Sequence, residues 1–239
     1  MDFKTALDFI ALCDAEPGTD RVVTAFRAAI RQFGFTCSAA GSWAGVGADR
    51  VHRFYFNDWP ADWMEIYARE VSFADDPAVN EARRSMTPFT LPELRASGAL
   101  PPAARRVISL GDDYGWRLLF FVPIHGPASY CGLVSLASKD GAALSPAARA
   151  ALEMMALAVH RRCRATPGFG VGPPPAPALT KRQTDCLRWV AAGKSDADIA
   201  GLLEIAEATV HFHIEAAKKR LGVRSRVQAV ALLVLNGTL

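Results

Sequence analysis

The sequence predicts an α+β protein, with an N-terminal α/β/α sandwich around a mainly antiparallel sheet and a C-terminal all-α helix-turn-helix domain. Three observations predict this class. Segments with helical spacing alternate with short β-rich runs up to residue 165. A stretch rich in proline and glycine then interrupts every period. Short helices with recognisable start signals follow it.

The first elements are an amphipathic helix and four strands. In RVVTAFRAAIRQFGF, Val22, Phe26, Ala29 and Phe33 recur at spacings of four, three and four, and Gly34 is a stop signal. Strands are predicted in TCSAAGSWA, VHRFYF, WRLLFFVPI and YCGLVSLAS, with turns in GVGAD and HGPAS. ADWMEIYARE and PAVNEARRSM lie between the two strand pairs and have helical character. Helices flanking a mainly antiparallel sheet make an α+β domain.

A helix in SPAARAALEMMALAVHRRCR closes this domain. Ser145 is a natural N-cap, and Pro146 suits the first helical position. One face carries apolar residues at spacings of four, three and four, namely Ala148, Leu152, Met155 and Val159. This face either packs on the protein's own sheet or forms a seam with a second copy of the chain.

A linker divides the chain. The 239 residues leave room for two domains. Residues 166–178, TPGFGVGPPPAPA, contain five prolines and three glycines. Because prolines deny backbone donors to a helix or sheet, we expect an extended linker here. It separates an N-terminal domain, residues 1–165, from a C-terminal domain, residues 179–239.

The positive charge is confined to the C-terminal domain. Residues 179–239 hold nine bases and six acids, which leaves eighteen of each from the totals of 27 and 24. This asymmetry favours a polyanionic partner for the last quarter of the chain.

Several classes of protein are disfavoured. No apolar run approaches the length of a membrane helix, and the N-terminus carries acids where a signal peptide has a basic leader. Five scattered cysteines without a CxxC indicate reduced thiols, so we expect a cytoplasmic protein with no membrane partner. GxSxG, HExxH and P-loop motifs are absent and the histidines are scattered, so we expect neither an enzyme nor a cofactor or metal site.

Three helices are predicted in the C-terminal domain. Thr180 and Gln183 form a capping box for the first, and Ser195 with Asp198 begins the second. The third, EATVHFHIEAAKKRL, has Ala206 at its capping position, which forgoes about 0.5–2 kcal/mol. Its apolar residues, Val210, Ile214, Ala217 and Leu221, would face the preceding helix. Two short helices joined by a tight turn predict a helix-turn-helix, whose second helix fits the major groove of DNA.

The third helix then presents its polar side chains to DNA. His211 and Glu215 are candidate base contacts, since a carboxylate accepts from the amino group of cytosine. The candidate phosphate contacts are Thr209, Lys194, Lys218, Lys219, Arg224 and Arg226. An ordinary solvated face is the alternative. A metal site at His211 and His213 is not expected, because residues two apart on a helix do not share a face.

Aromatic and acidic residues in the N-terminal domain suggest a small-molecule site. Trp63 and Tyr67 share a helical face, and Asp76–Pro77 follows after a short loop. An indole offers one N–H donor and a carboxylate only accepts, so around an apolar cavity they would hold a ligand with a carbonyl and an amide N–H. The alternatives are that the two aromatics are simple core and that Asp76 is a helix N-cap.

Two resemblances sharpen these expectations. Residues 179–231 resemble the LuxR-type helix-turn-helix through LT, AAGKS, DIA, TVHFH and RLGVRSR; Gln183, Glu204 and Ala206 depart from the usual Glu, Gly and Ser. The pattern W-x3-Y-x8-DP and residues of about 20–165 resemble the autoinducer-binding domain of LuxR-family quorum-sensing receptors. The second resemblance implies that Trp63 donates to the lactone carbonyl of an N-acyl-homoserine lactone and that Asp76 accepts from its amide. Tyr67 would line the pocket and Ser135 would bond the acyl amide or its 3-substituent.

Three departures from that family concern the cavity. Trp59 stands where several members have a tyrosine that bonds the amide carbonyl, and Leu91 and Leu119 replace a frequent tryptophan and glycine. The added bulk predicts a compact acyl group, branched or aromatic. A receptor for a different, non-lactone ligand is the alternative.

The resemblance implies a homodimeric transcription factor. It would bind an inverted-repeat promoter site, act with RNA polymerase and most commonly activate transcription when its signal is bound. A phosphorylation receiver, for which Asp75–Asp76 and Asp112–Asp113 offer acidic pairs, fits poorly because the strands come in adjacent pairs. A lactone hydrolase is a further alternative, but the chain contains no hydrolase motif such as GxSxG or HExxH.

Overall fold

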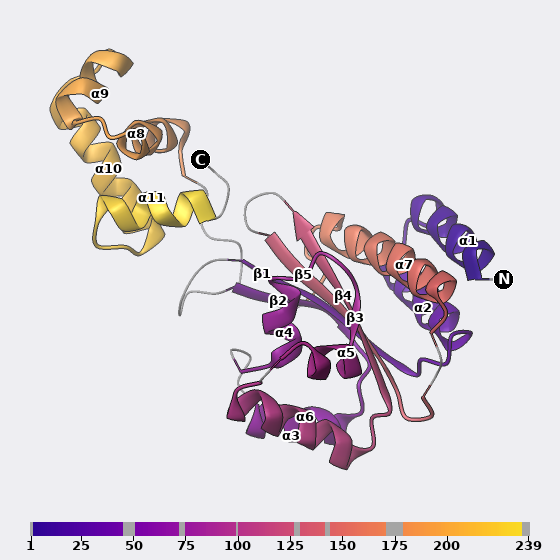
Figure 1. Ribbon diagram of the computed structural model, residues 1–239. Coiled ribbons are helices and arrows are strands. Elements are labelled where there is room, and N and C mark those ends of the chain that lie inside the picture. The colour runs from indigo at the N-terminus through magenta and orange to yellow at the C-terminus, as the bar shows by residue number, and fades with distance from the viewer. Residues whose placement is uncertain are drawn as a thin grey trace. The chain divides into compact units, whose positions relative to one another are not determined.

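The computed structural model describes residues 2–44, 51–71, 75–98, 100–126, 130–141, 144–170 and 179–235 (Figure 1). The chain separates into two compact units, one containing the sheet and the other the C-terminal helices. Most of the predicted turns GVGAD and HGPAS, and residues 171–178 of the predicted linker, lie outside the described residues. In the described part of the chain, no helix combines the length and the apolar character needed to cross a bilayer.

The first unit is built on a five-stranded sheet with the order β2-β1-β5-β4-β3. The strands are β1 (Cys37–Ala44), β2 (Val51–Asn57), β3 (Phe89–Thr90), β4 (Leu118–Gly126) and β5 (Tyr130–Ser138). The central β1 and β5 pair antiparallel, with Cys37 opposite Ala137 and Trp43 opposite Cys131. β3 pairs antiparallel with β4. All four predicted strands are confirmed, and the two-residue β3 was not predicted.

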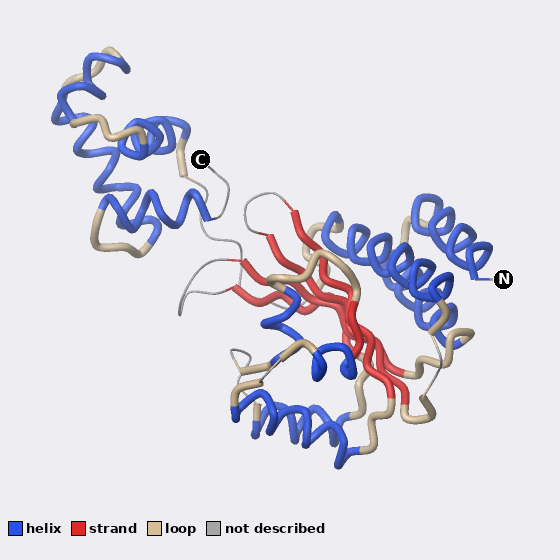
Figure 2. The backbone as a smooth tube through the Cα atoms, in the orientation of Figure 1, coloured by secondary structure: helices blue, strands red, loops and turns tan. Residues whose placement is uncertain are grey.

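Helices cover both faces of this sheet (Figures 1 and 2). On one face lie α1 (Asp2–Ala15), α2 (Thr19–Arg31) and α7 (Pro146–Ala165), and on the other lie α3 (Ala61–Glu70), α4 (Pro77–Ala82), α5 (Leu91–Ala96) and α6 (Pro102–Tyr114). Alternation along β4 serves both layers: Leu118, Phe120 and Val122 enter the first core, and Leu119 and Phe121 the second. The predicted α/β/α sandwich is confirmed.

The closing helix packs on its own sheet. Ser145 caps α7 by accepting from the backbone N–H of Ala148, as predicted. Its apolar face, Ala148, Leu152, Met155 and Val159, is buried. That face therefore belongs to the protein's own core and is not available as a seam with a second copy. The helix predicted over PAVNEARRSM ends earlier than expected, at Ala82.

One buried histidine predicts an acid-sensitive fold. His160 on α7 lies 3.2 Å from the carbonyl oxygen of Gly41, and burial lowers its pKa from 6.5 to about 4. Between these values the unfolded chain binds the proton and the folded chain does not, so stability is present above 6.5 and is lost as the pH falls. Urea unfolding should show that the free energy of unfolding falls by about 2 kcal/mol between about pH 7 and pH 5. The substitution His160→Gln should remove this contribution to the pH dependence of stability. Equal slopes for both proteins would contradict this assignment.

The second unit is all-helical, as predicted. It contains α8 (Lys181–Ala191), α9 (Asp196–Leu203), α10 (Glu207–Leu221) and α11 (Arg226–Leu235). Both capping boxes form, and Ala206 gives α10 no side-chain cap. Glu204 ends α9 in the left-handed region, with φ of 54°, which explains why glycine is usual at this position. α11 was not predicted.

Candidate functional site

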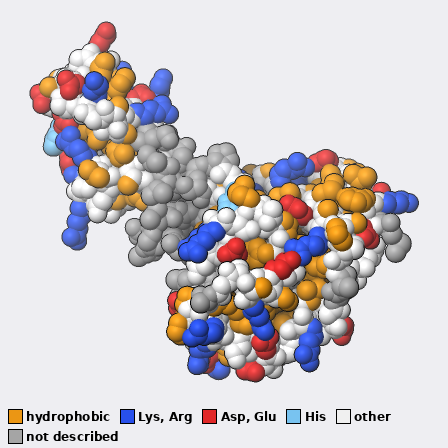
Figure 3. All heavy atoms as spheres, viewed as in Figure 1, with side chains coloured by type: hydrophobic (Ala, Val, Ile, Leu, Met, Phe, Trp, Pro, Cys, Tyr) orange, Lys and Arg blue, Asp and Glu red, His pale blue; other side chains and the backbone are white. Residues whose placement is uncertain are grey.

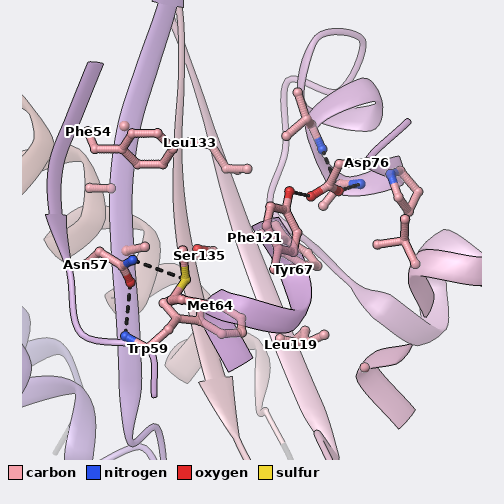
Figure 4. Close-up of a pocket in the computed structure, with 18 of the residues that line it drawn as sticks. Phe54, Asn57, Trp59, Met64, Tyr67, Asp76, Leu119, Phe121, Leu133 and Ser135 are labelled. Atoms are coloured by element: carbon pink, nitrogen blue, oxygen red, sulfur yellow. Dashed lines mark hydrogen bonds between the residues drawn. The ribbon is translucent and has the colours of Figure 1, made fainter. Parts of the chain in front are cut away.

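A cavity of about 160 Å³ lies between the sheet and the α3–α6 layer (Figure 4). All seven residues that the sequence suggested for ligand binding line it, namely Trp59, Trp63, Tyr67, Asp76, Leu91, Leu119 and Ser135. They come from six different segments of the chain, and most of the remaining wall is apolar. The structure thus brings the whole predicted set together. Their contacts with a ligand remain predictions.

An aromatic cluster holds Trp63 in place. Its side chain is 6% exposed, and its ring stacks on Trp59 with centroids 6.0 Å apart. The ring of Trp116 meets both edge-on, at 5.0 Å from Trp59 and 6.1 Å from Trp63. Tyr67 and Tyr114 pack against Trp63 as well. Such packing leaves the indole ring of Trp63 little freedom to change its orientation.

Asp76 has the capping role considered from the sequence, and its second oxygen bonds Tyr67. As the N-cap of α4, its Oδ1 accepts from the backbone N–H groups of Ala78, at 2.8 Å, and Val79, at 3.3 Å. Its Oδ2 accepts from the hydroxyl of Tyr67, which points at it in Figure 4. A carboxylate offers about four lone-pair positions, and these three bonds fill three of them. One acceptor position, on Oδ2, is left without a bond from Tyr67, Ala78 or Val79.

Burial gives this acceptor its electrostatic character. Desolvation raises the pKa of Asp76, while the bonds from Tyr67, Ala78 and Val79 act in the opposite direction. Burial and the neighbouring carboxylate raise the pKa of Tyr67, so its hydroxyl stays protonated and donates. Each further N–H aimed at Asp76 would stabilise the carboxylate in this dry environment.

Several wall residues were missed in the sequence. Phe121 and Leu133 lie two positions from Leu119 and Ser135 on the same strands, so strand alternation already placed them on the same face. Asn57 also lines the cavity. Its side-chain NH2 donates to the sulfur of Met64, at 3.2 Å, and its side-chain oxygen accepts from the backbone N–H of Trp59, at 3.0 Å (Figure 4). No periodic pattern marks Asn57, because it ends an edge strand.

Gly111 on α6 offers a test of the cavity's size. A Cβ there would meet Trp116 at 3.8 Å and Trp63 at 3.9 Å, which are ordinary contacts. Gly111→Ala should stabilise the ligand-free protein by roughly 0.5–1 kcal/mol through helix propensity. It should weaken ligand binding by about fourfold, the value of one methylene displaced from the cavity. Thermal melting and titration calorimetry measure the two effects.

Gly201→Ala on α9 is the matched control, since nothing lies within 4 Å of its Cβ position. It should give a similar gain in stability with no change in ligand affinity. If Gly111→Ala left ligand affinity equal to that of this control, the cavity would not be the binding site.

The second unit presents the predicted DNA contacts on and beside α10. The core of this unit includes Ile199, Val210, Ile214 and Ala217, as expected for a helix-turn-helix. His211, Glu215 and Lys219 are exposed on α10, and Thr209 and Lys218 are half-buried. Lys194 precedes α9, Arg224 follows α10 and Arg226 begins α11. The structure therefore brings the α10 residues together on one helix, with the other three on neighbouring segments.

Three of these side chains already have acidic partners. Lys218 pairs with Glu215 at 2.6 Å, and this contact lowers the pKa of Glu215. Asp196, which the sequence did not single out, pairs with Arg226 at 2.6 Å and lies 3.6 Å from His211. Binding to phosphate would require Lys218 and Arg226 to exchange these carboxylates for DNA, so part of the electrostatic gain from each phosphate contact would be offset by a lost ion pair.

Both parts of the chain match known protein families. Residues 18–163 match the autoinducer binding domain family, and residues 177–233 match the luxR family of bacterial regulatory proteins. The transcriptional activator protein BjaR1 of Bradyrhizobium diazoefficiens is 29% identical over 235 residues, covering 97% of this chain and 94% of the relative. The quorum sensing-dependent regulator RpaR of Rhodopseudomonas palustris is 30% identical over 223 residues, covering 90% and 87%.

Solved structures share the fold. SdiA in complex with octanoyl-rac-glycerol superposes with a TM-score of 0.79 at 19% identity, covering 99% of this chain and 96% of that chain. Escherichia coli SdiA in a second structure gives 0.76 at 20% identity, with 98% of each chain covered. Together with the family matches, these findings show that the chain belongs to the LuxR family of quorum-sensing transcription regulators, with an autoinducer-binding domain ahead of a DNA-binding helix-turn-helix, and that it is not an enzyme.

Proposed function

We propose that this regulator binds an N-acyl-homoserine lactone in the cavity of its first unit and, as a homodimer, activates transcription from an inverted-repeat promoter site. The observation that carries the proposal is a donor and an acceptor on one apolar cavity: the indole of Trp63 and the remaining acceptor position of Asp76. In this proposal, residues 1–165 bind the ligand and form the dimer, and residues 179–239 bind DNA. Residues 166–178 link the two domains.

The polar head of the lactone uses the polar groups of the cavity. Trp63 donates to the lactone carbonyl, Asp76 accepts from the amide N–H, and Tyr67 holds Asp76 in position. Ser135 donates to the acyl carbonyl. Leu91 packs near the lactone ring, Trp59 lies near the amide carbonyl, and Leu119 lies beside the acyl chain, whose burial contributes about 0.8 kcal/mol per methylene.

The size of the cavity supports a compact acyl group. Typical small-molecule sites enclose about 300–1,000 Å³, whereas this one encloses about 160 Å³. Leu119 occupies space that the glycine frequent at this position would leave open. A short branched or aromatic acyl group fits these walls better than a long straight chain.

Ligand binding and DNA binding are coupled through folding and dimerisation. A ligand that fills a core cavity binds only the folded state and stabilises it, by about 2.7 kcal/mol at a hundredfold excess over Kd. Helices α1 and α7 expose Phe3, Leu7 and Leu157, and hydrophobic side chains gather over them (Figure 3). We assign this surface to contact with a second copy. The dimer presents two α10 helices to half-sites about 34–36 Å apart.

We propose activation because BjaR1, which is similar over 97% of this chain, is a transcriptional activator protein. RNA polymerase is the partner through which an activator of this kind would act. In this proposal the protein acts in the cytoplasm, where bacterial promoter DNA lies.

A ligand panel tests the proposal. The full chain is expressed with butanoyl-, benzoyl- or dodecanoyl-homoserine lactone, with a monoacylglycerol, or without ligand, and its soluble yield and melting temperature are compared. We expect the compact lactones to raise both and the dodecanoyl lactone to have less effect. Stabilisation by the monoacylglycerol alone would make the protein a receptor for a non-lactone ligand. Equal results for every member of the panel would contradict ligand-coupled folding.

A further inference from the structure

Helix α10, the helix proposed to contact DNA, carries a large apolar side chain that is not part of the hydrophobic core. Phe212 on α10 is 66% exposed. The residues of this helix that form the core, Val210, Ile214 and Ala217, lie on its opposite side. A phenylalanine ring left in water gains none of the stabilisation that its burial would provide, so Phe212 contributes little to the stability of its own unit.

Its neighbours on the helix define the surface to which it belongs. Ala208 lies one turn before Phe212, Glu215 lies about one turn after it, and Lys219 lies two turns after it, all exposed. The ring has an edge-on contact with the imidazole of His213, with centroids 5.7 Å apart. Phe212 thus stands between the candidate base contact Glu215 and the N-terminus of α10, within the half of the helix that enters the major groove.

We propose that Phe212 is a specificity-determining residue that contacts the C5-methyl group of a thymine in the major groove. This inference rests on the DNA-binding function proposed above. The thymine methyl is the apolar feature of the major groove, and phenylalanine is among the side chains that contact it. Because Phe212 and Glu215 are three residues apart on one face, the thymine lies next to or one step from the base pair that Glu215 reads.

The test compares thymine with uracil, which differ by this methyl alone. The full chain, purified from cells grown with the lactone panel above, selects a duplex from a randomised pool. Each thymine of the selected site is then replaced singly by deoxyuridine, and Kd is measured. We expect one position in each half-site where wild-type protein loses about fourfold in affinity, the value of one buried methyl group. Phe212→Ala should bind DNA more weakly and show no difference in affinity between the thymine and uracil duplexes. Phe212→Leu should keep part of that difference.

Val227→Ala is the matched control, since Val227 on α11 is 72% exposed but lies on a different helix. It should keep the wild-type sensitivity to uracil. The inference is overturned if no position is sensitive, if Phe212→Ala retains the sensitivity, or if light scattering shows that Phe212→Ala changes self-association and leaves the DNA profile unchanged. A wild-type chain that enriches no duplex would instead contradict the DNA-binding function.

Discussion

Asp76→Asn is expected to remove most of the ligand-induced stabilisation while leaving the ligand-free fold nearly unchanged. Asparagine is as good an N-cap as aspartate, so the bonds to Ala78 and Val79 can persist. Its amide group, however, replaces Oδ2 with a donor. The hydroxyl of Tyr67 can rotate to accept from this donor, but the N–H of the ligand cannot. Loss of a hydrogen bond to a charged group costs about 1.5–3 kcal/mol, or roughly 10- to 150-fold in Kd. Melting temperatures with and without lactone measure this.

Two further variants separate the roles of Asp76. Asp76→Ala also loses the cap and should destabilise the ligand-free protein by about 0.5–2 kcal/mol. Asp75→Asn changes the exposed neighbouring carboxylate, which does not line the cavity, and should keep the full response to lactone. A full response in Asp76→Asn would exclude Asp76 as the acceptor for the ligand.

Trp63→Phe is expected to weaken lactone binding by roughly 5- to 150-fold, because the carbonyl of the bound ligand loses its donor and stays desolvated, at a cost of about 1–3 kcal/mol. Phenylalanine keeps an aromatic ring against Trp59 and Trp116. Calorimetry with the lactone and with its tetrahydrofuran analogue, which lacks the carbonyl, isolates the donor. Wild-type protein should prefer the lactone, and Trp63→Phe should not.

Trp116→Phe is the control for this variant. Trp116 is 4% exposed and packs behind Trp63 without lining the cavity. In the described part of the chain its indole N–H has no hydrogen-bond partner, so its removal costs no bond there. This variant should still distinguish the lactone from the carbonyl-free analogue. If it lost that preference while Trp63→Phe kept it, the donor would have been assigned to the wrong indole.

Long elements with a clear period were predictable from the sequence. The run YCGLVSLAS coincides with β5, and the apolar face of α7 is the predicted one. In both, local periodicity and burial agree. β3 is too short to show a period, and it exists because Phe89 and Thr90 pair with Phe121 and Phe120 of β4. α5 follows at once from a capping box of Thr90 and Glu93, a signal that was present but embedded in a proline-containing run.

The candidate site was predictable in its residue types and less so in its bonds. Spacing placed Trp63 and Tyr67 on one face and suggested a cap at Asp76. It could not indicate that Tyr67 bonds the oxygen which the cap leaves free, since that depends on how α3 and α4 pack. The same limit applies to Asp196, whose contacts with Arg226 and His211 join three helices.

The central claim is that Asp76 accepts the amide N–H of the signal in the cavity. An ester analogue, in which oxygen replaces that N–H, tests it most directly. Calorimetry with wild-type protein and Asp76→Asn against both ligands gives four affinities. The account predicts that wild-type protein binds the amide roughly 10- to 150-fold more tightly than the ester, and that Asp76→Asn shows little or no such preference. Equal binding of amide and ester by wild-type protein would contradict it.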